Sequence, residues 1–181
     1  MPAALLAILL LAATVDPSLA EPLRLLAEVG ARDTTDGHAG QFFADLPESL
    51  NLTLAVAELP RGAAGRYDSR TRTVTVAEAA IGEDSRVVAA VLAHELQHAV
   101  DARRVALGLL DRDCVAFEAR AFEAQAKTAR LFWPDELPGG TALERHVALV
   151  VREYEQDGAA GIAARVAADA RYREACAERP A

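Results

Sequence analysis

The chain has 181 residues, a length that suits one domain with a hydrophobic core of its own. Its 27 acidic and 19 basic residues give a net charge of −8, which argues against a protein that binds nucleic acid. With 52% hydrophobic and 25% charged residues, the chain is neither a disordered segment nor a coiled coil.

Residues 1–20 carry features of an export signal. An uncharged apolar run occupies 3–15, and Ser18 and Ala20 have the small-x-small pattern of a signal-peptidase site. The run is too short to anchor the chain across a bilayer, so we expect no stable membrane span. No basic residue precedes the run, and a buried N-terminal helix that ends at Asp16 is the alternative interpretation. Export to the cell envelope or beyond is slightly favoured over a cytoplasmic location.

The region after this segment predicts short helices and two strands. Apolar residues at helical spacing predict helices over 21–29 and around 42–46. The apolar sequence at 52–59 predicts a strand that ends at Pro60. Alternating branched and polar residues at 72–76 predict a second, half-exposed strand.

From residue 84 onward the pattern is helical. Proline and glycine separate predicted helices over 84–106, 113–132, 141–156 and 161–177. Residues 21–181 are therefore predicted to form a single α+β domain, in which a small antiparallel or mixed sheet of two or three strands packs on a helix-rich core.

An H-E-x-x-H sequence lies at 94–98, inside the helix predicted for 84–106. Because residues four apart share one face of a helix, the imidazoles of His94 and His98 can bind one metal ion. Glu95 lies about 100° round the helix, where it can act on a water beside the metal. The surrounding residues are apolar, and buried imidazoles need partners, which a shared zinc ion would provide. Two core histidines that bind backbone carbonyls or carboxylates are the alternative.

A catalytic zinc site needs a third protein ligand. The candidates after the motif are Asp111, Asp113, Cys114, Glu118, Glu123 and His146. Helical phase favours Glu118, since it lies in an apolar stripe where an unpaired carboxylate would be costly. Glu123 lies on the opposite face with Arg120 and Lys127, which we expect to be solvated. Cys114, one turn before Glu118 on the same stripe, is the main rival because thiolates bind zinc well.

The segment HELQHAV resembles HELTHAV of the thermolysin family, and the nineteen residues between His98 and Glu118 match the spacing of that family. Over about 73–125 the chain thus resembles a zincin metallopeptidase of the gluzincin type, close in size to the minigluzincins. The resemblance implies an endopeptidase acting on a peptide or protein substrate. One Zn²⁺ per chain would be bound by His94, His98 and Glu118, with Glu95 as the general base.

The chain departs from the thermolysin family around the third ligand. That family has Asn before its ligand glutamate and Asp four residues after it, where this chain has Phe117 and Phe122. A carboxylate that supports His94 must then come from elsewhere or be absent. Asp101 could support His98 in this way, and a surface charge at a helix end is the alternative.

A peptidase site also needs a surface that binds the substrate backbone and a donor to the oxyanion. The resemblance makes the strand Thr73–Val76 the edge strand that binds an extended peptide by strand addition, and an ordinary exposed strand is the alternative. The chemistry also requires a donor that stabilises the oxyanion. Spacing selects none of Tyr67, His146, Tyr154 and Tyr172 for that role.

Two questions stay open at this point. A zincin-like domain that no longer cleaves peptides and serves as a binding or regulatory module is the competing function, and Glu95 argues against it because such a module needs no general base. Cys114 and Cys176 either form a disulfide in an exported protein or remain buried thiols.

Overall fold

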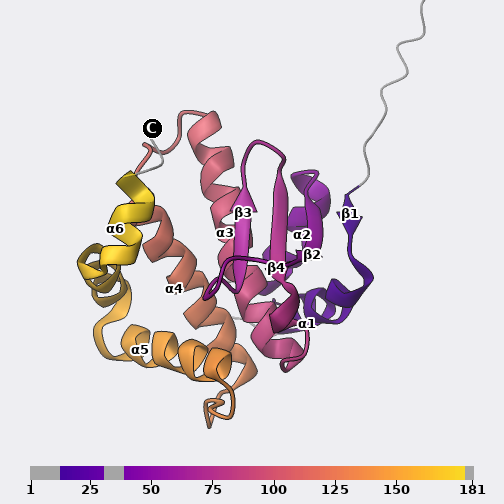
Figure 1. Ribbon diagram of the computed structural model, residues 1–181, viewed down its shortest axis with the longest axis vertical. Helices are drawn as coiled ribbons and strands as arrows, with labels where there is room; N and C mark the ends of the chain where they lie inside the picture. Colours follow the sequence, from indigo (N-terminus) through magenta and orange to yellow (C-terminus); the bar gives the residue numbers. More distant parts are fainter. Residues whose placement is uncertain (1–12, 31–38, 178–181) are drawn as a thin grey trace, which may run out of the picture.

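One mixed sheet forms one side of the fold, and helices pack against it (Figure 1). The computed structural model describes residues 13–30 and 39–177. Its strands are β1 (Thr14–Val15), β2 (Thr53–Ala57), β3 (Gly65–Asp68) and β4 (Thr73–Ala77), in the order β1-β2-β4-β3. β2 pairs in parallel with both β1 and β4, whereas β3 pairs antiparallel with β4. The structure thus confirms an α+β fold with a small mixed sheet.

Helices account for most of the remaining described chain. They are α1 (Ala20–Gly30), α2 (Ala39–Ser49), α3 (Ser85–Ala106), α4 (Cys114–Phe132), α5 (Ala142–Ala168) and α6 (Ala170–Ala177), with short 3₁₀ turns η1 (Pro17–Leu19) and η2 (Glu78–Ala80). In Figure 1, α3 lies beside the sheet, and α4, α5 and α6 lie on the other side of α3. None of the helices in the described ranges is long and apolar enough to cross a membrane.

The helices up to α4 follow the predicted boundaries closely because local signals define their ends, whereas the helix predicted for 161–177 is divided at Asp169 between α5 and α6. The side chains of Asp84 and Asp113 accept hydrogen bonds from backbone N–H groups in the first turns of α3 and α4. α5 begins with a capping box formed by Thr141 and Glu144. The predicted break near Gly158 is a kink inside α5, where this glycine has a φ of 66°.

The sheet differs from the prediction at its edge. The expected strand at Thr73–Val76 exists as β4, but it lies between β2 and β3, so the prediction that it forms the sheet edge is wrong. β3 takes that position because the chain turns back after Asp68 and pairs Gly65 with Val76. β3 was not predicted, since the sequence GRYD has no apolar alternation.

The first residues of the described chain join the domain. β1 pairs with β2, and the Leu19 side chain is fully buried in the core. Most of the apolar run at 3–15 lies outside the described residues, so export stays a prediction.

The helix α3 passes through the centre of the domain, as its apolar faces predicted. One face, including Leu92 and Leu96, packs in a core cluster with the sheet, α1 and α2. The other face, including Val87 and Ala90, packs in a second cluster with α4 and α5. Because α3 is held on both sides, the side chains in its middle have fixed positions.

Candidate metal centre

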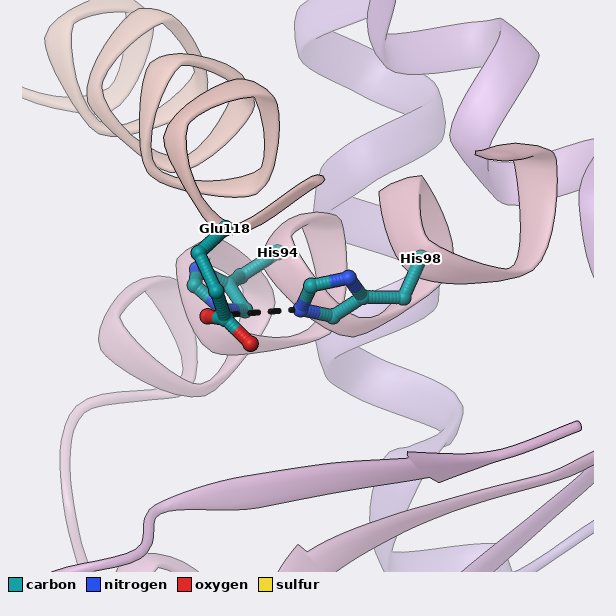
Figure 2. Close-up of side chains that lie close together, drawn as sticks. All are labelled: His94, His98 and Glu118. Carbon is teal, nitrogen blue, oxygen red and sulfur yellow. Dashed lines mark ion pairs between the residues drawn. The ribbon is translucent and has the colours of Figure 1, made fainter. Parts of the chain in front are cut away.

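His94, His98 and Glu118 come together where α4 crosses α3 (Figure 2). The two imidazoles lie one turn apart on α3, with ring centroids 5.0 Å apart. Their Nε2 atoms lie 3.6 and 3.7 Å from the same carboxylate oxygen of Glu118, Oε2. Within the described ranges, this is the one group of His, Cys, Asp or Glu side chains that could hold a metal ion.

The distances from Glu118 Oε2 to the two Nε2 atoms fit two pairs of ligands on one ion better than they fit hydrogen bonds. Distances of 3.6 and 3.7 Å are longer than a good N–H···O hydrogen bond. Two ligand atoms that each lie about 2.0–2.2 Å from a tetrahedral metal would be about 3.3–3.6 Å apart. Both distances from Glu118 are therefore close to those between two ligands of one tetrahedral ion.

The carboxylate of Glu118 and the imidazole of His98 shift each other's pKa. Burial alone would raise the pKa of Glu118, but the neighbouring imidazoles of His94 and His98 outweigh this effect and hold the pKa far below its usual range. Burial alone would lower the pKa of His98, but the carboxylates of Glu118, Glu95 and Asp101 raise it on balance. Glu118 is thus held as an anion beside the imidazoles, as a metal ligand must be.

Glu95 lies beside this group and faces the edge of the sheet. Its side chain is buried, and this burial raises the pKa of its carboxyl. The backbone N–H of Tyr67 in β3 partly offsets this effect and lowers the pKa of the Glu95 carboxyl. A Cβ atom at Gly65 would lie only 2.7 Å from the Cγ and Oε1 atoms of Glu95. The backbone of β3 therefore positions Glu95, a role that the sequence analysis missed.

The Nδ1 atom of His94, the ring nitrogen other than the one near Glu118, has no hydrogen bond to a carboxylate among the described residues. This atom is buried and has no other hydrogen-bond partner among them. The ring instead packs edge-on against Phe122, with centroids 4.5 Å apart. An aromatic contact, and no carboxylate of the described residues, thus supports this imidazole.

Asp101 has a different role from either interpretation of the sequence. It is completely buried, so the prediction of a surface charge is wrong. Its carboxylate accepts hydrogen bonds from Arg120 Nε at 3.0 Å and from Gln97 Nε2 at 3.1 Å. Arg120 was expected on a solvated face, but it crosses from α4 to this carboxylate on α3. Asp101 acts on His98 through its charge, which raises the pKa of that imidazole.

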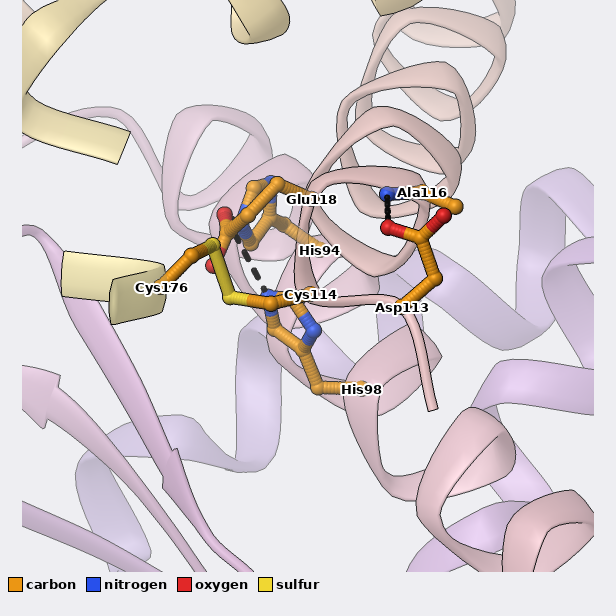
Figure 3. Close-up of a disulfide and its surroundings, with 7 residues drawn as sticks. All are labelled: His94, His98, Asp113, Cys114, Ala116, Glu118 and Cys176. Atoms are coloured by element: carbon orange, nitrogen blue, oxygen red, sulfur yellow. Dashed lines mark hydrogen bonds and ion pairs between the residues drawn. A yellow bond between two sulfur atoms is a disulfide. The ribbon is translucent and has the colours of Figure 1, made fainter. Parts of the chain in front are cut away.

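The two cysteines form a disulfide that joins the first turn of α4 to α6 (Figure 3). Cys114 therefore offers no thiolate, and its interpretation as the third metal ligand is wrong. Two other candidates have structural partners: Asp113 caps α4, and Glu123 forms an ion pair with Lys127 at 2.9 Å. Of the candidate third ligands, only Glu118 reaches both imidazoles.

A cleft of about 920 Å³ opens over the three-residue group. Its walls come from β3, α3, α4, the start of α5, and α6. It contains three of the four candidate donors, Tyr67, His146 and Tyr172. The fourth, Tyr154, does not line the cleft and lies near the Lys127 ammonium group.

Comparisons of this chain with family models, with curated proteins and with solved structures find no significant match. Two helices bring together a group that could hold a metal ion, and a buried carboxylate lies next to it in an open cleft.

Proposed function

We propose that this protein is a zinc-dependent peptidase of the gluzincin type. One observation carries the proposal: the carboxylate of Glu118, on a second helix, faces both imidazoles of the H-E-x-x-H sequence. A chance H-E-x-x-H sequence would not be expected to have such a partner after nineteen intervening residues.

The donor set favours zinc over other common ions. Two imidazole nitrogens and one carboxylate oxygen are ligands of known catalytic zinc sites, in which a fourth position stays open. Magnesium and calcium prefer sites made of oxygen atoms alone. The ligand atoms lie within 4.8 Å of one another, which supports one ion per chain.

Glu95 is the proposed general base. A zinc ion held by the three ligands would polarise a water molecule and lower its pKa towards neutrality. The carboxylate of Glu95 lies in the same cleft, where it would accept a proton from the attacking water. The water oxygen bonds to the scissile carbonyl carbon, the C–N bond breaks, and Glu95 passes its proton to the departing amine.

The strand β3 is the proposed binding site for the substrate backbone. It is the outer strand of the sheet and lies beside Glu95, so an extended peptide could pair with it as a further strand. The residues Tyr67, His146 and Tyr172 line the same cleft and are the candidates for a donor to the oxyanion.

The experiment that tests this function combines metal analysis with digestion of a peptide library. Purified protein should contain about one zinc per chain and should cleave peptides. Glu95→Gln should keep the zinc and lose about 10²–10⁴-fold in kcat, because it removes the base and leaves the ligands in place. Wild-type protein that holds zinc but cleaves no peptide would favour the binding or regulatory module. Protein that takes up no zinc would contradict both the peptidase and the zincin-like module.

A further inference from the structure

The rim of the cleft is basic although the chain as a whole is acidic. Arg61 and Arg66 line the cleft on the side of β3, and Arg171 lines it on the side of α6. The segment 61–72 contains four arginines and one acidic residue, Asp68, in a chain with a net charge of −8. Positive charge is therefore concentrated beside the group that could hold the metal.

The two arginines on the β3 side are available to a ligand. Arg61 and Arg66 are exposed, and neither forms an ion pair with any carboxylate in the described part of the chain. Asp68 accepts hydrogen bonds from backbone N–H groups of its own turn, and it interacts with Arg66 through its charge without forming an ion pair. Arg171 differs, because its guanidinium is paired with Asp169 at 2.6 Å.

The acidic side chains of the cleft do not cancel this charge at the rim. Glu83 keeps its negative charge, but it lies beside the start of α5, where the Thr141 hydroxyl donates a hydrogen bond to it at 2.5 Å. Glu95 and Glu118 lie at the floor of the cleft, against the backbone of β3 and the two imidazoles. An acidic ligand that enters the cleft would thus contact Arg61 and Arg66 before it reaches the carboxylates at the floor.

The geometry of β3 places Arg66 where a bound peptide would meet it. Gly65 faces Glu95, and the Tyr67 side chain packs on the core cluster below the sheet. Because side chains alternate along a strand, Arg66 faces the other side. A peptide paired with β3 would place one of its own side chains about 4.5–5.5 Å from that of Arg66, measured between Cβ atoms.

We propose that this site selects acidic peptides, with Asp or Glu next to the scissile bond bound by Arg66 and Arg61. This inference rests on the proposed peptidase function. A guanidinium pairs with a carboxylate through two parallel N–H···O hydrogen bonds, so it distinguishes Glu from the neutral amide of Gln. The attraction is partly exposed and therefore depends on salt.

The test uses two peptides that are identical except for Glu or Gln at the positions flanking a cleaved bond. Wild-type protein at low salt should cleave the Glu peptide with a kcat/KM about tenfold higher, since each exposed pair gives up to about fivefold. The double variant Arg61→Gln/Arg66→Gln should lower this ratio to about one while keeping its zinc. High salt should reduce the wild-type ratio in the same direction.

A matched control separates local recognition from overall charge. Arg103 and Arg112 are also exposed arginines, but they lie outside the cleft. The double variant Arg103→Gln/Arg112→Gln changes the net charge by the same amount and should keep the tenfold ratio. A ratio that falls equally in both double variants would overturn the proposal. It would show that the preference for the Glu peptide comes from the net charge of the protein and not from binding by Arg61 and Arg66.

The failure of this proposal is distinct from the failure of the proposed function. If wild-type protein cleaves both peptides equally well, the protein is a peptidase and the selection of acidic substrates is wrong. If wild-type protein cleaves neither peptide nor any member of a library, the peptidase function is wrong. The proposed selection of acidic peptides is then wrong as well, because it rests on that function.

Discussion

The backbone of Gly65 lies against the carboxylate of Glu95, so that a Cβ atom at position 65 would be 2.7 Å from Oε1. The contact joins the outer strand of the sheet to the helix that carries both histidines. It leaves no room for a side chain at position 65 unless Glu95 moves. The position of the proposed general base therefore depends on a residue that has no side chain of its own.

The first prediction is that Gly65→Ala lowers kcat without loss of zinc. The added methyl group would displace the Glu95 carboxylate, and a shift of about 1 Å at a catalytic group can cost about 10²-fold in rate. Steady-state kinetics and metal analysis of the same preparation measure the two effects. Gly82→Ala is the control, because a Cβ at that position meets nothing within 4 Å. Full activity in Gly65→Ala would show that Glu95 tolerates the displacement or is not the base.

The second prediction concerns the third metal ligand. Glu118→Ala should weaken zinc binding by more than the 10–100-fold typical of losing a residue that only supports a ligand, and it should abolish cleavage. Competition with a chelator measures the affinity. Glu123→Ala, on the same helix, removes a carboxylate that forms an ion pair with Lys127 and should leave zinc affinity unchanged. Equal zinc affinity in the two variants would exclude Glu118 from the site.

The helices that bear the site could be predicted because their signals are local. The H-E-x-x-H spacing and the apolar faces of the surrounding helix place His94 and His98 on one side. The phase of the next helix singles out Glu118 among its acidic residues. Each inference uses only positions within a few turns of one another, so the packing of the rest of the chain does not change it.

The strand order and the charged contact between helices could not be predicted from the sequence. β3 is a strand because β4 and α3 flank it, and its own residues carry no alternation. A helical wheel places Arg120 on a charged face, but it does not show that Asp101 lies opposite on α3. Both features depend on residues that are distant in sequence and are brought together only by the fold.

The third prediction is that Asp101→Ala destabilises the fold. It would leave the Arg120 guanidinium without its buried partner, and the free energy of unfolding should fall by about 2–3 kcal/mol. Thermal unfolding of the zinc-loaded protein measures this loss, and Asp111→Ala, an exposed carboxylate of the following loop, should change little. Replacing both partners, as in Asp101→Leu/Arg120→Leu, should recover part of the stability, since no charge is left unpaired. A double variant less stable than Asp101→Ala would contradict this account.

The fourth prediction concerns the disulfide between Cys114 and Cys176, which fastens α6 to the start of α4. α6 has 8 residues, too few for a stable helix on its own, and it carries Arg171 and Tyr172 into the cleft. Without the disulfide, α6 should detach for part of the time and remove that wall of the cleft. The variant Cys114→Ser/Cys176→Ser should therefore show a several-fold lower kcat/KM, with zinc retained because the ligands lie on α3 and α4.

Limited proteolysis and a reductant identify the cause of that loss. Trypsin should cleave after Arg171 and Arg173 faster in the double variant than in wild-type protein, because a detached segment is accessible. A mild reductant should lower the activity of wild-type protein to the level of the double variant and should not affect the double variant itself. Equal trypsin cleavage and unchanged activity after reduction would show that the contact between Tyr172 and Phe122, with ring centroids 5.6 Å apart, suffices to hold α6 in place.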